Sequence, residues 1–269
     1  MDALYIVTVY VGLADSLPPI GYQDDVRCQV TAAEVLTVAV IAARYFQNHY
    51  ERALYIMVER GDIPHLSISR FNRRLHQLLG WLQPLARQVR QPIPSTSLCL
   101  IDAFPLPVCK RVRQHRCRKV RGEAFLGRIG AKKEWFFGYR LHWCCDATGL
   151  PLAFTLRPAR RHEGSAVSRL LAHLPLGTTV VGDGAYVSRP RAVFWQTRGI
   201  RLVAKRYGRM SPNPPEERAL LAQRQMIETV HSQLESMGLQ RLRARTRPGF
   251  WLKVMCSLLA LIFLHWLPN

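Results

Sequence analysis

The sequence contains few acidic residues. Asp and Glu total 18 against 38 Lys and Arg, which gives the 269-residue chain a formal net charge of +20 and a pI near 10.5. A soluble metabolic enzyme rarely carries so much like charge because the cations repel one another, whereas a protein that lies along phosphates needs it. An Arg-rich proteome would raise the number of arginines but would not explain the scarcity of acids. The charge balance therefore favours nucleic-acid binding.

The sequence also lacks a secretory signal and a long uninterrupted apolar run. The apolar stretch 1–13 has no basic n-region and no small-residue cleavage site. In the apolar stretch 250–267, Lys253 and His265 leave only eleven residues between them, 254–264. Eleven residues are too few to span a bilayer and fit a buried core helix. We therefore expect a soluble, cytoplasmic protein that does not contact a membrane.

Paired cysteines at regular spacing are absent. The seven cysteines are an odd number and are scattered along the chain, which indicates a reducing compartment. Cys109, His115 and Cys117 come nearest to a metal-binding pattern. They lie in a basic run without a second pair of ligands at the spacing of a zinc site, so the pattern disfavours structural zinc.

Helical patterns fill the first 90 residues. Thr31 and Glu34 form a capping box at the start of an apolar helix, and a second helix is expected over 50–59. Ser67 or Ser69 can cap a third helix. The third helix alternates apolar residues at helical spacing with a polar face that carries Arg70, Arg73 and Arg74. In a helix–turn–helix layout such a face reads the major groove; the alternative is a solvated basic face of a helical bundle.

The Pro-containing segment 91–96 is the best domain boundary. It separates a small helical, helix–turn–helix-like DNA-binding domain, 1–90, from a larger domain, 97–269. The larger domain combines strands and helices, which predicts an α/β fold with a mixed sheet flanked by helices. The expected strands are 97–101, 135–145, 152–157, 179–182 and 199–204, and the expected helices are 164–174, 190–197 and 216–237.

Three carboxylates stand out by their positions. Asp102 and Asp183 each follow an apolar strand, which places them at a sheet edge where ligands bind in open α/β folds. Glu228 lies in the last long polar helix beside Met226, Ile227 and Val230, so we expect its face to pack towards the sheet. Three such acids could hold a pair of Mg²⁺ ions for an in-line phosphoryl displacement. Taken singly, each acid could instead be a turn, cap or surface residue.

Five motifs occur in order along the chain. They are Ile101-Asp-Ala-Phe-Pro-Leu-Pro-Val-Cys109, Lys132-Lys-Glu-Trp-Phe-Phe-Gly-Tyr-Arg-Leu-His142, Gly149-Leu-Pro151, Gly182-Asp-Gly-Ala-Tyr186 and Arg224-x3-Glu228-Thr-Val-His-Ser-Gln-Leu234. Together they resemble bacterial insertion-sequence transposases of the Asp-Asp-Glu type, most closely the insertion-sequence 982 family. The resemblance covers most of the chain. It implies a ribonuclease-H-like fold, Mg²⁺ dependence with Mn²⁺ as a substitute, and double-stranded DNA as substrate, both element terminal repeats and target.

The resemblance also assigns residues. Asp102, Asp183 and Glu228 would be the catalytic, metal-binding acids, and Arg224 would hold a scissile or flanking phosphate. Tyr186 would pack or stack near DNA.

Lys133 and His142 occupy family-like positions as further DNA contacts, although a strand histidine is more often structural. Glu235, two helical turns beyond Glu228, is a rival third acid.

The expected activity is hydrolysis at the element ends followed by strand transfer, with a homodimer or larger assembly during synapsis. Two alternatives stay open. One is a ribonuclease-H-like nuclease or resolvase that cuts without joining, and the other is a decayed relative that only binds DNA.

Overall fold

The computed structural model describes residues 1–93, 96–130, 133–186, 188–206 and 211–267. The chain forms two compact units. The first comprises Met1–Pro94 and Gln233–Asn269, and the second comprises Ser95–Ser232. The boundary after Pro94 lies within the predicted linker 91–96. The other end differs from the predicted division, because the segment Gln233–Asn269 groups with the N-terminal helices instead of completing the domain 97–269.

Hydrogen bonds within the first unit explain this grouping. Asn48 Nδ2 donates to the carbonyl oxygen of Met237 and to Oγ of Ser257, each at 3.0 Å. The Tyr5 hydroxyl donates to the carbonyl oxygen of Ala260 at 2.9 Å. These partners are far apart in the sequence, so the local pattern of residues 250–267 could predict a buried helix but not the residues against which it packs.

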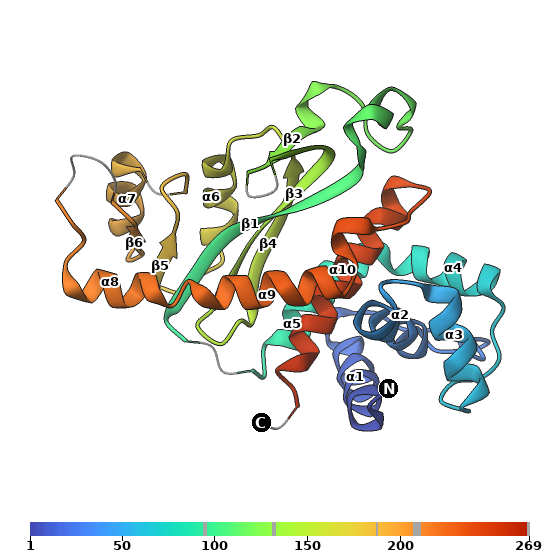
Figure 1. The fold of residues 1–269 in the computed structure, drawn as a ribbon. Helices are drawn as coiled ribbons and strands as arrows, with labels where there is room; N and C mark the ends of the chain where they lie inside the picture. Colours follow the sequence, from blue (N-terminus) through green and yellow to red (C-terminus); the bar gives the residue numbers. More distant parts are fainter. Residues whose placement is uncertain (94–95, 131–132, 187, 207–210, 268–269) are drawn as a thin grey trace. The chain divides into compact units, whose positions relative to one another are not determined.

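The first unit is helical (Figure 1). Its helices are α1 (Ala3–Ser16), α2 (Ala32–Phe46), α3 (Tyr50–Glu59), α4 (Ile68–Gln77), α5 (Leu82–Arg90) and α10 (Arg247–Leu264). The largely buried α2 packs against α1, α3 and α10. The predicted capping box is confirmed: Thr31 Oγ1 accepts from the Glu34 amide, and the Glu34 carboxylate accepts from the Thr31 amide. The predicted helix over 50–59 is also confirmed, and Ser67 is the residue that caps α4.

Two helices are long and apolar enough to cross a membrane by length and composition. They are Ala3–Ile20, with 39% of its residues buried, and Arg247–Leu264, with 67% buried. The core helix of a soluble protein passes the same test. Within the first unit the two segments contact each other, because Gly12 lies against the Phe263 ring.

The second unit is built on a six-stranded sheet. Its strands are β1 (Leu98–Lys110), β2 (Leu126–Ile129), β3 (Glu134–Asp146), β4 (Pro151–Pro158), β5 (Thr179–Gly182) and β6 (Arg201–Ala204). The order is β2-β3-β1-β5-β6, and β4 also pairs with β3. β1 runs antiparallel to β3 and parallel to β5, and β5 runs parallel to β6. The predicted mixed sheet is confirmed, but β1 extends well beyond the predicted end at Ile101, and the sequence did not predict β2.

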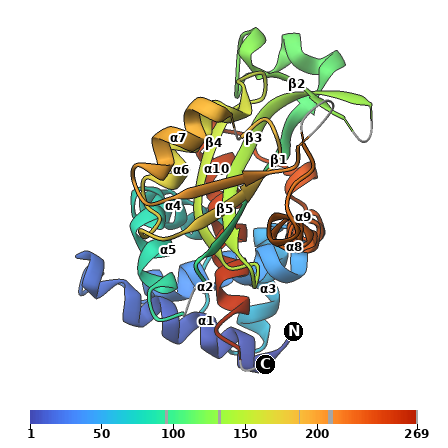
Figure 2. The same cartoon turned by 90° about the vertical axis from the view of Figure 1, so that its left-hand side faces the viewer.

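Helices cover both faces of this sheet, as Figure 2 shows. α6 (Val167–Leu171) and α7 (Arg189–Gln196) lie on one face, where Ile101, Cys144 and Val180 pack with Leu170 and Trp195. The other face is covered by α8 (Pro215–Ala222) and the first part of α9 (Gln225–Ser236).

The predicted single helix 216–237 is interrupted. The Arg224 amide donates to the Leu221 carbonyl at 3.2 Å, and the Met226 amide donates to the Gln223 carbonyl at 3.1 Å. These three-residue turns divide α8 from α9, so Arg224 stands just before α9 begins and not inside a continuous helix.

Candidate active site

Asp102 lies within β1, not at its end. Side chains alternate between the two faces of a strand, so Asp102 shares a face with Leu100 and Phe104, while Ile101 points to the opposite core. Its side chain is 25% exposed, and its Oδ1 accepts a hydrogen bond from the Ala103 amide at 2.7 Å. The prediction that the strand ends at Asp102 was therefore wrong, because Pro105 and Pro107 did not break the pairing of β1 with β3.

Asp183 follows β5 directly, as predicted. β1 and β5 are paired in parallel, with Leu98 opposite Thr179 and Leu100 opposite Val181. Continued by two residues, this register sets Asp102 opposite Asp183 on strands about 4.8 Å apart. Asp183 lies one residue beyond β5, so its place next to Asp102 of β1 is an extrapolation of this register.

The turn after β5 is fixed by close packing and by its own hydrogen bonds. Asp183 Oδ1 accepts from the Ala185 amide at 2.8 Å, and the Tyr186 amide donates to the Asp183 carbonyl at 3.1 Å. A Cβ on Gly182 would lie 2.6 Å from Cγ2 of Ile101. Glycine at this position thus allows β5 to approach β1 closely where Asp183 emerges.

Glu228 is exposed in α9, which contradicts the expectation that its face packs towards the sheet. The buried side of α9 is formed by Ile227, Val230 and Leu234. Residues of a helix are separated by about 100°, so apolar neighbours directly beside Glu228 do not share its face. Glu228 therefore lies at the exposed margin of this buried side.

Arg224 faces the first aspartate. Its Nη2 lies 3.6 Å from Asp102 Oδ2, and the two side chains are 26% and 25% exposed. The buried Arg224 Nε has no hydrogen-bond partner among the residues that the structure describes. This pairing brings the Arg of the last motif to the Asp of the first motif within one unit.

The sequence did not single out His231, yet it joins α9 to the sheet on the same face. Trp143 Nε1 donates to His231 Nε2 at 3.2 Å, and the His231 ring lies 5.2 Å from that of Phe104. Trp143 is also the residue that pairs with Asp102 across β1 and β3. Burial lowers the pKa of His231 to about 4, so the imidazole is neutral at pH 7 and its Nε2 accepts the bond.

His142 and Tyr186 are buried on the opposite face, with 0% and 1% of their surface exposed. Their predicted contact with DNA is therefore not compatible with the structure. His142 Nδ1 and the Tyr186 hydroxyl share a hydrogen bond of 2.8 Å, which ties the turn after β5 to β3. Burial, with smaller effects from Arg140 and Arg157, lowers the pKa of His142 to about 4. Both residues position the turn that carries Asp183.

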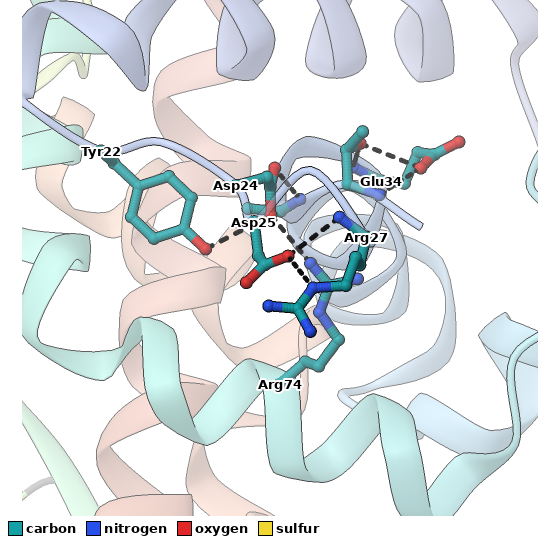
Figure 3. Close-up of polar contacts among 8 residues, drawn as sticks. Tyr22, Asp24, Asp25, Arg27, Glu34 and Arg74 are labelled. Atoms are coloured by element: carbon teal, nitrogen blue, oxygen red, sulfur yellow. Dashed lines mark hydrogen bonds and ion pairs between the residues drawn. The ribbon is translucent and has the colours of Figure 1, made fainter. Parts of the chain in front are cut away.

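The remaining predicted DNA contacts are exposed except one. Lys133, in the turn before β3, and Arg70 and Arg73, on α4, are exposed. Arg74 is held by an ion pair: its Nη2 lies 2.8 Å from Oδ1 of Asp24, as Figure 3 shows. Asp24 also accepts from the Ala32 amide at 2.8 Å, so this arginine helps to hold α4 to the start of α2.

The two aspartates fit part of a divalent-metal site. Carboxylate oxygens are the ligands that hard divalent cations prefer. Within the described residues, however, no group of three or more His, Cys, Asp or Glu is placed to hold a metal. Asp102 and Asp183 are the two predicted ligands that the sheet brings together, and Glu228 lies outside this pair. The rival acid Glu235 belongs to the first unit, where it accepts from Gln240 Nε2 at 2.6 Å.

The fold and the sequence were compared with known proteins. The structure of the piggyBac transposase, a synaptic complex with hairpin DNA, is similar to this chain with a TM-score of 0.54 and 13% sequence identity. The similarity covers 97% of this chain and 73% of that one, and it shows the ribonuclease-H-like fold that the sequence predicts. A search among curated proteins found no match.

Residues 93–263 match the family described as the transposase DDE domain. This match covers well over half of the chain, so the chain belongs to that family. It is a transposase of the Asp-Asp-Glu type.

Proposed function

We propose that this chain is a DNA transposase that cuts the ends of an insertion sequence and joins them to target DNA. Membership of the transposase DDE family supports the class of protein. The observation that supports the proposal is the parallel register of β1 and β5 just before Asp102 and Asp183, which, continued by two residues, would bring the two acids side by side. The five motifs further support a place in the insertion-sequence 982 family.

The proposed reaction needs no covalent link between enzyme and DNA. In the first step a water oxygen attacks phosphorus and the P–O3′ bond breaks, which frees a 3′-hydroxyl at the element end. In the second step that 3′-hydroxyl loses its proton and its oxygen attacks a target phosphorus, while the target's own P–O3′ bond breaks and leaves a protonated 3′-hydroxyl, so one bond forms for each bond that breaks. When bound, divalent cations would stabilise the attacking and leaving oxygens.

Each residue then has a distinct task. Asp102 and Asp183 would hold the cation, and Glu228 would supply the third carboxylate. Arg224, paired with Asp102 in the absence of DNA, would turn its guanidinium to a scissile or flanking phosphate. The Trp143–His231 hydrogen bond would keep α9 against the sheet during both steps.

The test uses the full chain, oligonucleotides that carry the inverted repeats flanking its coding region, a supercoiled target plasmid and Mg²⁺. We expect cleavage at the repeat ends and covalent joining to the plasmid. Asp102→Asn, Asp183→Asn and Glu228→Gln should each abolish both steps while binding to the repeat ends in EDTA persists.

Glu235→Gln is the matched control for Glu228→Gln, because both replace an exposed acid of α9. If Glu235→Gln lost activity and Glu228→Gln kept it, the assignment of the third acid would be wrong. Free cutting without joining would favour the nuclease or resolvase. Binding without either step, at any concentration of Mg²⁺ or Mn²⁺, would favour the decayed relative.

A further inference from the structure

A strongly basic segment follows the long strand β1. Residues 110–121, which we call the basic arm, contain seven Lys and Arg residues in 12 positions, and no Asp or Glu occurs between Ala103 and Gly122. Its exposed basic residues are Lys110, Arg111, Arg113, His115, Arg116, Arg118 and Arg121. In Figures 1 and 2 the arm, in green, lies beside β2 at one end of the sheet.

The arm has a defined structure and is anchored at both ends. Lys110 still pairs with Phe136 of β3, and Arg111–Arg116 forms a 3₁₀ helix. Cys117 comes back beside the start of the arm, where its thiol lies near that of Cys109. Val120, near the end of the arm, is buried. A segment that is held in this way loses less conformational entropy on binding than a free tail does.

Both thiols are partly buried. Burial and the neighbouring Cys117 raise the pKa of Cys109 to about 11. The arm is organised by packing and hydrogen bonds, and most of its Lys and Arg side chains are exposed.

An exposed aromatic residue lies among these cations. Trp135, near the start of β3, is 44% exposed, and the Arg111 guanidinium lies 5.4 Å from the centroid of its ring. Arg128 of β2 is exposed and pairs with Trp135 across the strands. Val112, 83% exposed, adds a second apolar group on the arm itself. An aromatic ring flanked by guanidinium groups can contact both sugar or base and phosphate.

Most of the arm's positive charge lies on exposed side chains. In the described part of the chain, none of its exposed Lys and Arg side chains forms an ion pair with a carboxylate. Like charges at this density repel one another, and a polyanion would relieve that repulsion. By contrast, Arg74 on α4 already has Asp24 as its partner.

We propose that the basic arm and Trp135 form a second DNA-binding element, which grips the phosphate backbone of duplex DNA irrespective of its sequence. The proposal deepens the proposed function, because it rests on DNA being the substrate. It assigns a positioning role to the arm, which would hold duplex DNA to the same unit that carries Asp102 and Asp183. Neither the acids nor the helix–turn–helix-like α4 would fill that role.

The test measures binding of the full chain to a short duplex of arbitrary sequence in EDTA, where no cleavage can occur. The arm variant is the triple substitution Arg113→Gln, Arg116→Gln and Arg118→Gln. The control removes the same charge from exposed arginines elsewhere: Arg27→Gln, Arg161→Gln and Arg169→Gln. We expect the arm variant to bind at least about tenfold more weakly than the control and to lower the slope of log K against log salt by roughly 2–3.

Trp135→Leu separates the aromatic contribution from charge. It should weaken binding several-fold and leave the salt slope unchanged, since no phosphate contact is lost. Thermal unfolding of each variant, followed by circular dichroism, identifies any variant that fails to fold. If the arm variant fails, the triple substitution Arg113→Lys, Arg116→Lys and Arg118→Lys replaces it. This variant keeps the charge and should therefore retain most of the salt slope.

Equal binding of the arm variant and its control would overturn the proposal. If the arm variant lost binding to vesicles that contain phosphatidylserine but bound the duplex as well as the control does, the partner of the arm would be a membrane surface and the proposal would be overturned. The proposed function fails in a different way: the wild type would bind the duplex through the arm, yet it would neither cut nor join with Mg²⁺.

Discussion

The two faces of the sheet carry polar side chains in different surroundings. On the face covered by α9, Asp102 is a quarter exposed and is paired with an arginine at 3.6 Å. On the face covered by α6 and α7, His142 and Tyr186 are almost fully buried and bonded to each other. Residues that are neighbours in the sequence, such as Trp143 and His142, point to opposite faces. A polar residue in a motif can therefore serve either the reaction or the fold, depending on the face to which it points.

The largest expected difference between the faces is in activity. Asp102→Asn should reduce cleavage on the order of 10³-fold or more, because it removes a proposed ligand for the cation and a counter-charge of Arg224. Its free energy of unfolding should change by less than about 1 kcal/mol, because the side chain is part-exposed. Single-turnover cleavage and urea denaturation measure the two effects. A loss of several kcal/mol in stability would show that Asp102 belongs with the structural residues.

Asp146, at the end of β3, is the acid with which to compare Asp102. It is fully buried, and its Oδ1 accepts from the amides of Thr148 and Leu150 and from the Thr148 hydroxyl, at 2.7–3.0 Å. Asp146→Ala would leave these donors without a partner, so we expect a loss of about 3 kcal/mol in urea denaturation. If the variant were as stable as the wild type, the contrast between the two acids would be lost.

The histidines predict a dependence of stability on pH. Burial holds the pKa of His142 and of His231 at about 4 in the folded protein, below the 6.5 of a free histidine. The unfolded chain therefore binds more protons between these values, so stability is complete above pH 6.5 and falls as the pH drops towards 4. The expected loss is on the order of 2 kcal/mol per histidine, measured as the urea midpoint against pH.

A matched pair of variants assigns this loss to the two faces. His142→Gln and His231→Gln should each flatten the pH profile of stability between pH 6.5 and 4. An unchanged profile in both variants would mean that other groups cause the loss.

The smallest expected effect is that of the buried hydroxyl. Tyr186→Phe removes the partner of His142 Nδ1 and should cost about 1–2 kcal/mol of unfolding free energy. Because the ring still packs behind the turn that carries Asp183, cleavage should fall by less than about tenfold. Binding to DNA should not change, because the residue is buried. Weaker DNA binding at equal stability would restore the contact with DNA that the sequence suggests.

The local sequence predicted most elements of the fold because their signals are local. The capping box at Thr31 fixed the start of α2, and the apolar run before Asp183 fixed β5. The extension of β1 through two prolines was not predictable, since a proline is tolerated where its missing amide is not needed for pairing. The break before α9 at Arg224 was missed because residues 216–237 contain no internal Gly or Pro to mark it.

The site was predictable only in part. By itself, the sequence determined that acids follow or interrupt apolar strands, that the chain is strongly basic, and that the motifs are those of a transposase. Only the tertiary structure decided what each side chain meets. Asp24 neutralises Arg74 from 50 positions away, Tyr186 bonds His142 across 44 positions, and Arg224 reaches Asp102. The physical reason is that pairing across strands and helices depends on which face a residue occupies, and neighbouring residues in a chain occupy different faces.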